Sequence, residues 1–373
     1  MHFLFVAPEI CPPFTEGRKR FVADLTAELA VGHRVDLLTS QPTTQRDTLS
    51  PPATAPCCRH PAACLLRPLA ALPSRLSGGR PDVVCQFPYG TFTGVRRFAN
   101  TLFMRAVDTY CRAKGIPCVT VLYSIEGSLS PAAIARHVSC LALSQRPDWQ
   151  GYRVDIGLGF DQWPPRPKRA AGPLRILFLA GMWQRRAERL DHVLEVRGLR
   201  HILQAGEELS SHGFQATAAS PLFEYPELRE RVLSEPSNKW PAGTLTLLGT
   251  APVPDVYYHA DLFLFPYSSP ILHFVPTSVL EAMAAGTPTV LADHPFLRTL
   301  AGVGEIAFFF DPSKQGDLER AVLAAARDPE RLSLVASTAQ KHVTKEWSLR
   351  RSAQQLLEVA SAVRRRHGAS PSL

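Results

Sequence analysis

The segment HFVPTSVLEAMAAGTPTV, residues 273–290, combines an apolar run with one carboxylate and breaks at Gly286. Ser278 and Glu281 fit the S-x-x-E capping box, whose side chains bind free N–H groups at a helix start. Gly286 is expected to end this helix in a left-handed conformation, and residues 289–291 are expected to form a short buried strand. Glu281 is then either a helix-start residue only or a ligand-binding group beside a helix N-terminus.

Length and composition indicate a globular protein of two domains. The chain has 373 residues, of which 45% are hydrophobic and 20% charged, and its length favours domains of about 150 to 200 residues. Its apolar runs are shorter than the roughly 18 residues that a membrane span needs. The opening MHFLFVAPEICPP lacks a basic leader and a cleavage site, so a cytoplasmic location is expected.

The eight cysteines all lie in the first 140 residues. In a cytoplasmic chain they are expected to stay reduced. The cluster CCRHPAAC, residues 57–64, lacks the paired C-x-x-C spacing of structural zinc. A plain loop is the preferred interpretation, and no metal is expected there.

The net charge of +8 suits an anionic ligand, a nucleic acid or an anionic membrane surface. Basic clusters occur at Arg18–Arg20, Arg96–Arg97 and Arg364–Arg366. No nucleic-acid-binding signature accompanies them, so no nucleic acid partner is expected. Residues 93–107 mix basic and apolar side chains and suit peripheral contact with the inner face of a membrane at most; core packing explains them equally well.

Apolar strands alternate with helical patterns along the chain, which predicts parallel sheets covered by helices. Strands are expected near residues 2–7, 34–38, 82–86, 117–122, 139–143, 174–181, 245–248, 262–265, 289–292 and 306–310. Helices are expected over 18–30 and 346–366, and the Pro-rich WPPRPK, residues 163–168, is the predicted linker. The two halves therefore look like two open α/β sheets, whose ligands bind at the carboxyl ends of the strands.

Each half begins with a strand that runs into a basic loop. The first loop places Gly17 before a helix that opens with Arg18, a geometry suited to an anion. The second loop combines Gly181 with several guanidinium groups, which grip a diphosphate bidentately; they belong to Arg185, Arg186, Arg189 and Arg197. For each arginine, a solvated surface charge is the alternative interpretation.

The sequence PTSVLE supplies another helix N-terminus in the second half. Its amides at 277–279 are expected to hold phosphate oxygens, and Glu281 to accept a hydrogen bond from a sugar hydroxyl. No D-x-D motif occurs, so helix dipoles and arginines, rather than a carboxylate-held metal, are expected to stabilise a leaving diphosphate. P-loop, G-x-G-x-x-G, G-x-S-x-G and H-E-x-x-H patterns are absent in the required places.

Taken in order, these motifs resemble the GT-B glycosyltransferases, specifically the large retaining group called family 4. MHFLFVAPEICPPFTEG, RPDVV, GIPCVTVLYS and VDIGLGFDQWPP look like the acceptor domain, and LRILFLAG, LTLLGT and PTSVLEAMAAGTPTVLAD like the donor domain. The resemblance implies an α/β fold of two Rossmann-like, doubly wound domains facing a central cleft. They would span 1–163 and 169–346, joined by a linker at 164–168, with residues 347–373 forming a helix that crosses back to the first domain.

The resemblance also implies a UDP- or GDP-type sugar bound by the second domain and a hydroxyl-bearing acceptor bound by the first. Glu281 would bond the donor ribose, and Arg197 would replace the lysine of the family's Lys-Gly. Donor-binding residues would be Gly17, Gly181, Arg185, Arg186, Arg197, Pro276, Thr277, Ser278, Val279 and Glu281, and acceptor-binding residues Glu16, Arg18, Tyr123 and Glu126. The acceptor would be a glycan, a lipid-linked sugar or a small-molecule glycoside.

Three positions depart from the family pattern. Met182 stands where the arginine of G-R-L would be, His273 replaces the first glutamate of E-x7-E, and residues 122–124 lack the usual histidine. Glu281 and His273 are the expected catalytic residues of a retaining, metal-independent and cofactor-free transferase, in which the leaving phosphate assists the incoming hydroxyl. A GT-B epimerase or phosphorylase, or a non-catalytic GT-B subunit that binds a nucleotide sugar or supports an active partner, are the alternatives.

Overall fold

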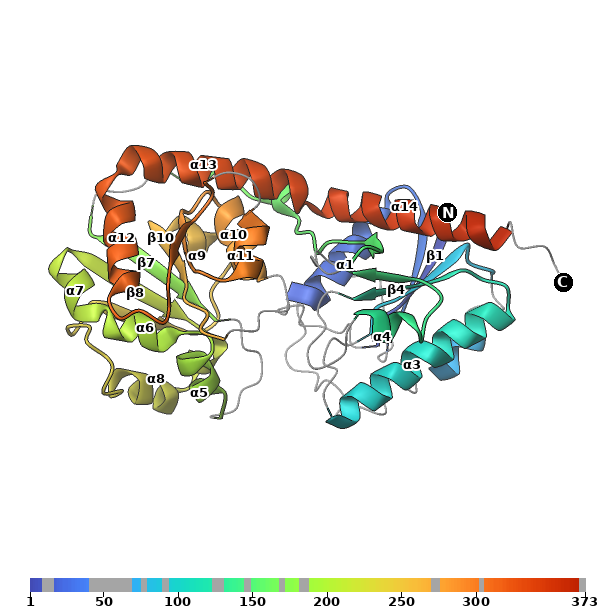
Figure 1. Ribbon diagram of the computed structural model, residues 1–373, viewed down its shortest axis with the longest axis horizontal. Coiled ribbons are helices and arrows are strands. Elements are labelled where there is room, and N and C mark those ends of the chain that lie inside the picture. The colour runs from blue at the N-terminus through green and yellow to red at the C-terminus, as the bar shows by residue number, and fades with distance from the viewer. Residues whose placement is uncertain are drawn as a thin grey trace. The chain divides into compact units, whose positions relative to one another are not determined.

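The structure is a computed structural model that describes residues 1–8, 17–39, 69–74, 79–88, 94–122, 131–143, 149–167, 172–180, 188–269, 276–301 and 305–368. The chain forms two compact units. Residues 1–159 and 347–373 build the first, and residues 160–272 and 276–346 the second. Each contains a six-stranded parallel sheet with helices packed against it (Figure 1).

The first sheet has the strand order β2-β1-β3-β4-β5-β6. Its strands are β1 (His2–Val6), β2 (Arg34–Leu38), β3 (Val83–Gln86), β4 (Cys118–Leu122), β5 (Leu141–Leu143) and β6 (Tyr152–Arg153). The helices of this unit are α1 (Gly17–Ala30), α3 (Gly94–Ala113), α4 (Pro131–Ala135) and α14 (Leu349–Gly368). β3 and β4 are buried along their whole length, as expected for parallel strands covered on both faces.

The second sheet has the order β12-β11-β10-β7-β8-β9. Its strands are β7 (Leu174–Leu179), β8 (Phe214–Ala219), β9 (Leu245–Leu248), β10 (Leu262–Phe265), β11 (Thr289–Ala292) and β12 (Phe308–Phe310). Its α-helices are α5 (Glu188–Glu195), α6 (Leu199–Gln204), α7 (Gly206–Ser211), α8 (Pro226–Leu233), α9 (Asp255–Tyr258), α10 (Thr277–Ala284), α11 (Pro295–Ala301), α12 (Asp317–Arg327) and α13 (Pro329–Glu346).

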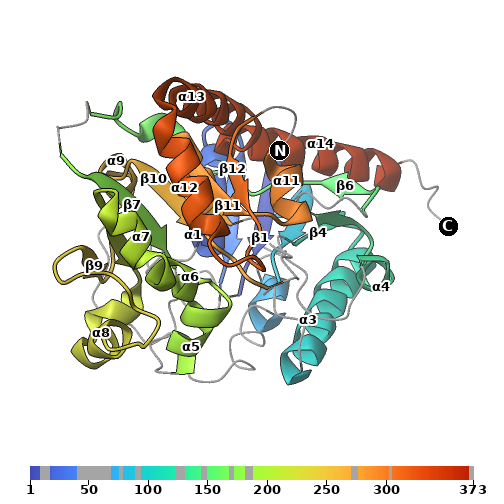
Figure 2. The same ribbon diagram turned by 60° about the vertical axis from the view of Figure 1, so that its left-hand side comes forward.

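The first strand of each half lies inside its sheet, with a neighbour on either side. β1 pairs with β2 and β3, and β7 pairs with β8 and β10. In the first sheet the chain leaves β1 and β3 toward opposite edges, and in the second sheet it leaves β7 and β10 toward opposite edges. In open α/β sheets, ligands bind at the carboxyl ends of such a strand pair. Figure 2 shows β7 and β10 side by side within the second sheet.

The ten predicted strands are confirmed, most of them to within two residues at either end. Two strands were not predicted. β8 reads FQATAA, in which alanine and glutamine favour a helix more than a strand, and β6 has two residues only. In the part of the chain that the structure describes, no helix is long and apolar enough to cross a bilayer.

The Pro-rich segment expected to be a linker has no regular structure over residues 163–167 and is bound to the second unit. The hydroxyl of Tyr258 donates to the carbonyl of Pro164. The guanidinium of Arg166 donates to the carbonyls of Gly286 and Ala260. Residues 164–166 are therefore attached to the loops that flank α10 and β10.

The terminal helix α14 returns to the first unit, as predicted, and packs against α1. Gln355 carries much of this attachment: its Oε1 accepts from the amide of Asp155 at 2.8 Å, and its Nε2 donates to Oδ2 of Asp155 at 3.0 Å. Asp155 is 1% exposed, so its carboxylate depends on such partners.

Replacing Gln355 by Ala is expected to lower the free energy of unfolding by about 1–3 kcal/mol, because the buried Asp155 loses the two hydrogen bonds that Gln355 makes with it. Gln354→Ala is the matched control, since Gln354 is exposed and bonds Glu358 on its own helix. Urea denaturation followed by circular dichroism measures both changes. Equal effects of the two substitutions would contradict the role given to Gln355.

Candidate functional site

Helix α10 begins where the chain returns from the carboxyl end of β10. Its first residue is Thr277, and Pro276 precedes it as the N-cap, with no side chain capping the helix. The carbonyl of Pro276 accepts from the amides of Val279 at 3.0 Å and Leu280 at 3.3 Å. The predicted cap by Ser278 is therefore wrong: Pro276, with its fixed φ and no N–H, is the N-cap, and the helix starts two residues earlier.

Because α10 starts earlier than predicted, different backbone amides are left without a partner inside the helix. Of the three that the sequence offered for phosphate, the amide of Val279 already donates to Pro276. Thr277 and Ser278, both half-buried, supply the N–H groups of the first turn. Such groups, at the positive end of the helix dipole, favour an anion.

The other end of α10 closes as predicted. Gly286 has φ +68° and donates to the carbonyl of Met283 at 3.0 Å, while Thr287 donates to Ala282 at 2.9 Å. These two bonds form a Schellman motif. The positive charge of Arg166 at the Gly286 carbonyl is favourable at this negative end of the helix.

Glu281 lies on the half-buried side of α10, opposite residues that are completely buried, such as Leu280 and Met283. Its Oε2 accepts a hydrogen bond of 2.9 Å from the hydroxyl of Tyr257. Burial, followed by the charge of Glu281 and this hydrogen bond, raises the pKa of Tyr257 well above its ordinary value. Tyr257 therefore remains a hydrogen-bond donor over the whole physiological pH range.

Tyr257 was not predicted as a site residue. The sequence did contain one indication of its role: Tyr257 and Tyr258 stand just before an apolar strand, and a tyrosine buried there needs a hydrogen-bond partner for its hydroxyl. Nothing in the sequence, however, links Tyr257 to a carboxylate 24 positions later.

Arg197 lies at the turn between α5 and α6, which is tied to the chain leaving β10. The amide of Ser268 donates to the carbonyl of Val196 at 3.1 Å, and its hydroxyl donates to the carbonyl of Glu195 at 2.8 Å. The guanidinium of Arg197 lies 5.7 Å from the centre of the Tyr267 ring. A cation is thus fixed at the carboxyl end of β10, the strand that leads to α10.

Gly198 allows this close approach. Its φ of +81° lies in the left-handed region, and a Cβ atom there would meet the carbonyl oxygen of Pro266 at 1.7 Å. Only glycine fits both constraints. Gly198 therefore allows Arg197 to lie close to the end of β10.

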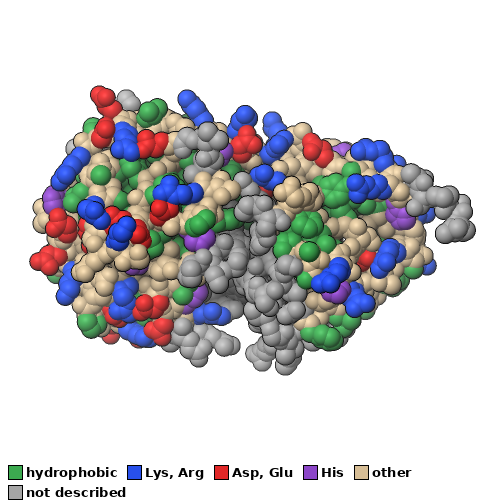
Figure 3. Space-filling view, in the orientation of Figure 1, with side chains coloured by type: hydrophobic (Ala, Val, Ile, Leu, Met, Phe, Trp, Pro, Cys, Tyr) green, Lys and Arg blue, Asp and Glu red, His purple; other side chains and the backbone are tan. Residues whose placement is uncertain are grey.

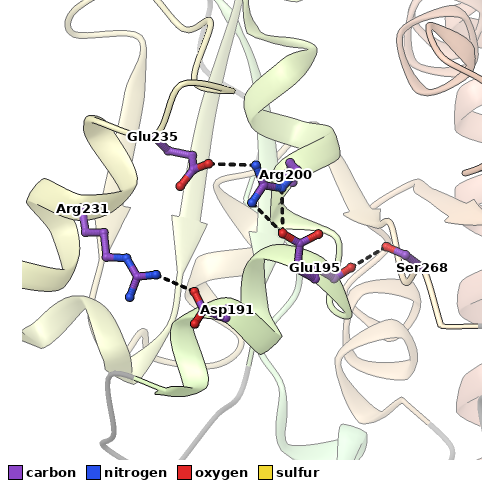
Figure 4. A network of polar contacts seen from close by, with 6 residues as sticks. All are labelled: Asp191, Glu195, Arg200, Arg231, Glu235 and Ser268. Carbon is purple, nitrogen blue, oxygen red and sulfur yellow. Dashed lines mark hydrogen bonds and ion pairs between the residues drawn. The ribbon is translucent and has the colours of Figure 1, made fainter.

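Ion pairs join α5 to α6 and to α8, as Figure 4 shows. Arg200 on α6 reaches Glu195 at 2.6 Å and Glu235 at 2.8 Å, and Arg231 on α8 reaches Asp191 on α5 at 2.6 Å. These pairs are partly exposed, so each contributes little alone. Together they connect the turn to α5, α6 and α8.

Two arginines, Arg197 and Arg189, act on the one histidine of α5. Burial, then the charges of Arg197 and Arg189, lower the pKa of His192, the half-buried histidine of α5. His192 is therefore mostly neutral near pH 7, and the positive charges close to it are those of Arg189 and Arg197. Such a surrounding suits a phosphate or diphosphate group.

Among the predicted donor residues, Pro276 is the N-cap of α10, the helix itself carries Thr277, Ser278, Val279 and Glu281, and the turn after α5 carries Arg197. Gly17 begins α1, as expected for a helix start. The remaining predictions lie outside the described residues: Glu16, Tyr123, Glu126, Gly181, Arg185, Arg186, His273, the side chain of Arg18 and the cysteine cluster at 57–64. Within the described ranges, no three His, Cys, Asp or Glu side chains gather as a metal site would require.

Gly198→Ala is expected to destabilise the second unit more than Gly213→Ala. Gly213 is the matched control, because its φ is +80° but nothing lies within 4 Å of its added Cβ. The control should cost about 1–2 kcal/mol of unfolding free energy for its left-handed backbone. Gly198→Ala should cost a further ~1–3 kcal/mol for the contact with Pro266. Equal losses in urea denaturation would show that this contact is relieved without strain.

The chain was compared with known protein families, curated sequences and solved structures. Residues 241–342, which contain α9, β10 and α10, match the family described as glycosyl transferases group 1. No curated protein sequence matches the chain.

Solved structures share the fold of nearly the whole chain at low identity. Sucrose-phosphate synthase from Thermosynechococcus elongatus superposes with a TM-score of 0.69 at 13% identity, over 97% of this chain and 99% of that one. The catalytic domain of starch synthase IV from Arabidopsis thaliana, bound to ADP and acarbose, gives 0.68 at 12%, over 98% and 99%. Anabaena HepE in complex with UDP-glucose gives 0.62 at 14%, over 97% and 100%. The chain therefore has the GT-B fold of two Rossmann-like domains, and its residues 241–342 match the family of group 1 glycosyl transferases.

Proposed function

We propose that the protein is a retaining glycosyltransferase that moves a sugar from a nucleoside-diphosphate sugar to a hydroxyl-bearing acceptor. One observation carries the proposal: within the matched segment, Glu281 is held by Tyr257 just beyond the first turn of α10. The structures of HepE with UDP-glucose and of starch synthase IV with ADP support a donor of this class. A UDP- or GDP-type donor remains the specific expectation.

The charge of the donor would be met by the second unit. In the proposed complex, the amides of Thr277 and Ser278 and the guanidinium of Arg197 bind the diphosphate. Their positive potential stabilises the negative charge that grows on the leaving group as the glycosidic bond breaks. No divalent metal or other cofactor is required in this scheme.

Retention is proposed to involve the leaving diphosphate itself. As the anomeric carbon separates from the phosphate oxygen, the acceptor hydroxyl forms the new bond on the same face and passes its proton to that phosphate oxygen. The acceptor is proposed to be a glycan, a lipid-linked sugar or a small-molecule glycoside held by the first unit.

A panel of UDP-, GDP-, TDP- and ADP-sugars should give a thermal shift with one donor in the wild-type protein. At about 100 times its dissociation constant, a specific ligand stabilises a protein by roughly 2.7 kcal/mol. Glu281→Ala should abolish the shift, and Glu207→Ala, at an exposed glutamate of α7 in the same unit, should retain it. No shift with any donor from a well-folded protein would favour a non-catalytic subunit that supports an active partner.

We also propose that the first unit contacts an anionic membrane surface through one face of α3. Phe98 and Leu102 are 72% and 57% exposed, and Arg105 and Arg112 continue the same helical stripe at spacings of three and seven residues. In Figure 3, hydrophobic and basic side chains adjoin in the lower right, where α3 and α4 lie. Apolar side chains flanked by arginines are typical of helices that lie in a membrane interface.

The same stripe presents no acidic side chain. Asp108, the one acid of α3, is 1% exposed. It is bound instead to the amide of Ser139 at 2.8 Å and to Arg112 at 3.0 Å. With Arg112 paired to Asp108, Arg105 supplies the positive charge of this stripe, which matches anionic lipid headgroups.

The double substitution Phe98→Ser and Leu102→Ser is expected to lower binding to vesicles containing phosphatidylglycerol by at least about tenfold, since two apolar side chains no longer enter the interface. Leu334→Ser is the matched control, because Leu334 is 64% exposed on α13 of the other unit. Flotation at low salt measures binding, and raised salt should weaken it. Wild-type protein that stays wholly in the soluble fraction at low salt would contradict the proposal.

A further inference from the structure

Tyr257 is the most firmly held polar side chain beside the candidate site. It is completely buried, and its ring packs edge-on against Phe263 of β10, with centroids 5.6 Å apart. Its carbonyl accepts a hydrogen bond of 2.9 Å from the hydroxyl of Thr287, which is also completely buried. Both ends of the residue are thus fixed before its hydroxyl meets Glu281.

The side chain of Glu281 has the opposite character. A glutamate has several rotatable bonds, and ordering a side chain of this length costs up to roughly 1.5–2 kcal/mol. Glu281 is half-buried on α10, so packing constrains it less than its neighbours Leu280 and Ala282, which are completely buried. A rigid donor 2.9 Å from Oε2 therefore restricts its carboxylate in addition to packing.

This hydrogen bond is compatible with a second partner for the carboxylate. An ionised carboxylate only accepts hydrogen bonds, and its two oxygens offer about four acceptor positions. The hydroxyl of Tyr257 uses one of them, and a ligand that offers two adjacent hydroxyls would suit a carboxylate held in one plane. A sugar diol is a ligand of this kind.

We infer that Tyr257 is a positioning residue: it holds the carboxylate of Glu281 in the orientation that receives the ribose diol of a nucleoside diphosphate. The inference rests on the proposed function, because it takes the ligand from there. Tyr257 makes no contact with the ligand in this scheme. It orders the side chain of Glu281 before the ligand binds, so that binding does not have to supply the free energy of ordering this side chain.

A structural role is the competing explanation, since the same bond also gives a buried hydroxyl its partner. The two explanations differ in what they predict for ligands that lack the diol. If Tyr257 only supports the fold, removing its hydroxyl weakens every nucleotide alike. If it positions Glu281, the loss is confined to ligands that carry ribose hydroxyls.

The test compares Tyr257→Phe with wild-type protein in isothermal titration calorimetry. The ligands are the nucleoside diphosphate that wild-type protein binds best among UDP, GDP and ADP, and its 2′,3′-dideoxy analogue. Tyr258→Phe is the matched control, because Tyr258 is the next residue and its hydroxyl bonds Pro164 instead. Should Tyr257→Phe not fold, Thr287→Val, which releases the carbonyl of Tyr257, carries the same comparison.

Tyr257→Phe should weaken the ribonucleotide about tenfold, as expected for one lost hydrogen bond to a charged group, and the dideoxy analogue less than twofold. The control should change neither ratio. An equal loss for both ligands, or no loss, would overturn the inference.

The wild-type protein separates this inference from the proposed function. Equal affinity for the two ligands would overturn the positioning role of Tyr257 and leave nucleotide binding intact. Binding of neither ligand would overturn both proposals.

Discussion

The position of β7 between β10 and β8 is the constraint on which the donor-side geometry depends. Leu177 of β7 lies opposite Phe263 of β10 on one side and Thr217 of β8 on the other. Parallel strands bring their carboxyl ends to one edge of the sheet, so the chain segments that follow β7 and β10 must meet there. Arg197 and α10 are both delivered to this edge.

Short polar contacts then convert this placement into a fixed site. The turn that carries Arg197 is bonded to Ser268, and the carboxylate on α10 is bonded to Tyr257 of α9. Both contacts are made by residues on either side of β10, whose four residues are all buried. The buried strand thus lies between the two residues, Tyr257 and Ser268, that hold Glu281 and the Arg197 turn in place.

Much of this architecture could be predicted from the sequence, because short segments determine it locally. β9, β10 and β11 were placed to the residue, since each is a short apolar run next to proline, aspartate or glycine. Gly286 behaves as predicted for the same reason: a glycine after a helical run is a strong stop signal. β8 could not be recognised, because its strand character comes from its neighbours β7 and β9 and not from FQATAA itself.

Individual residues of the candidate site could be predicted from the sequence, but the contacts between them could not. Glu281 and Arg197 carry recognisable motifs, whereas Tyr257 and Arg166 act through partners far away in the sequence. The start of α10 was misassigned by two residues, because two signals compete there, and Pro276, whose ring sets the backbone, prevails over Ser278. Such outcomes depend on tertiary contacts that no short pattern contains.

The contacts of Arg166 determine where the chain can be divided into two halves. Its guanidinium binds the carbonyls of Gly286 and Ala260, so a residue that belongs to the Pro-rich segment completes the helix that carries Glu281. An excised C-terminal half that began after residue 168 would contain every donor-side motif and still lack this cap. The natural starting point for an independent donor module is therefore upstream of Pro164, and the segment is better regarded as the first part of that module than as a spacer.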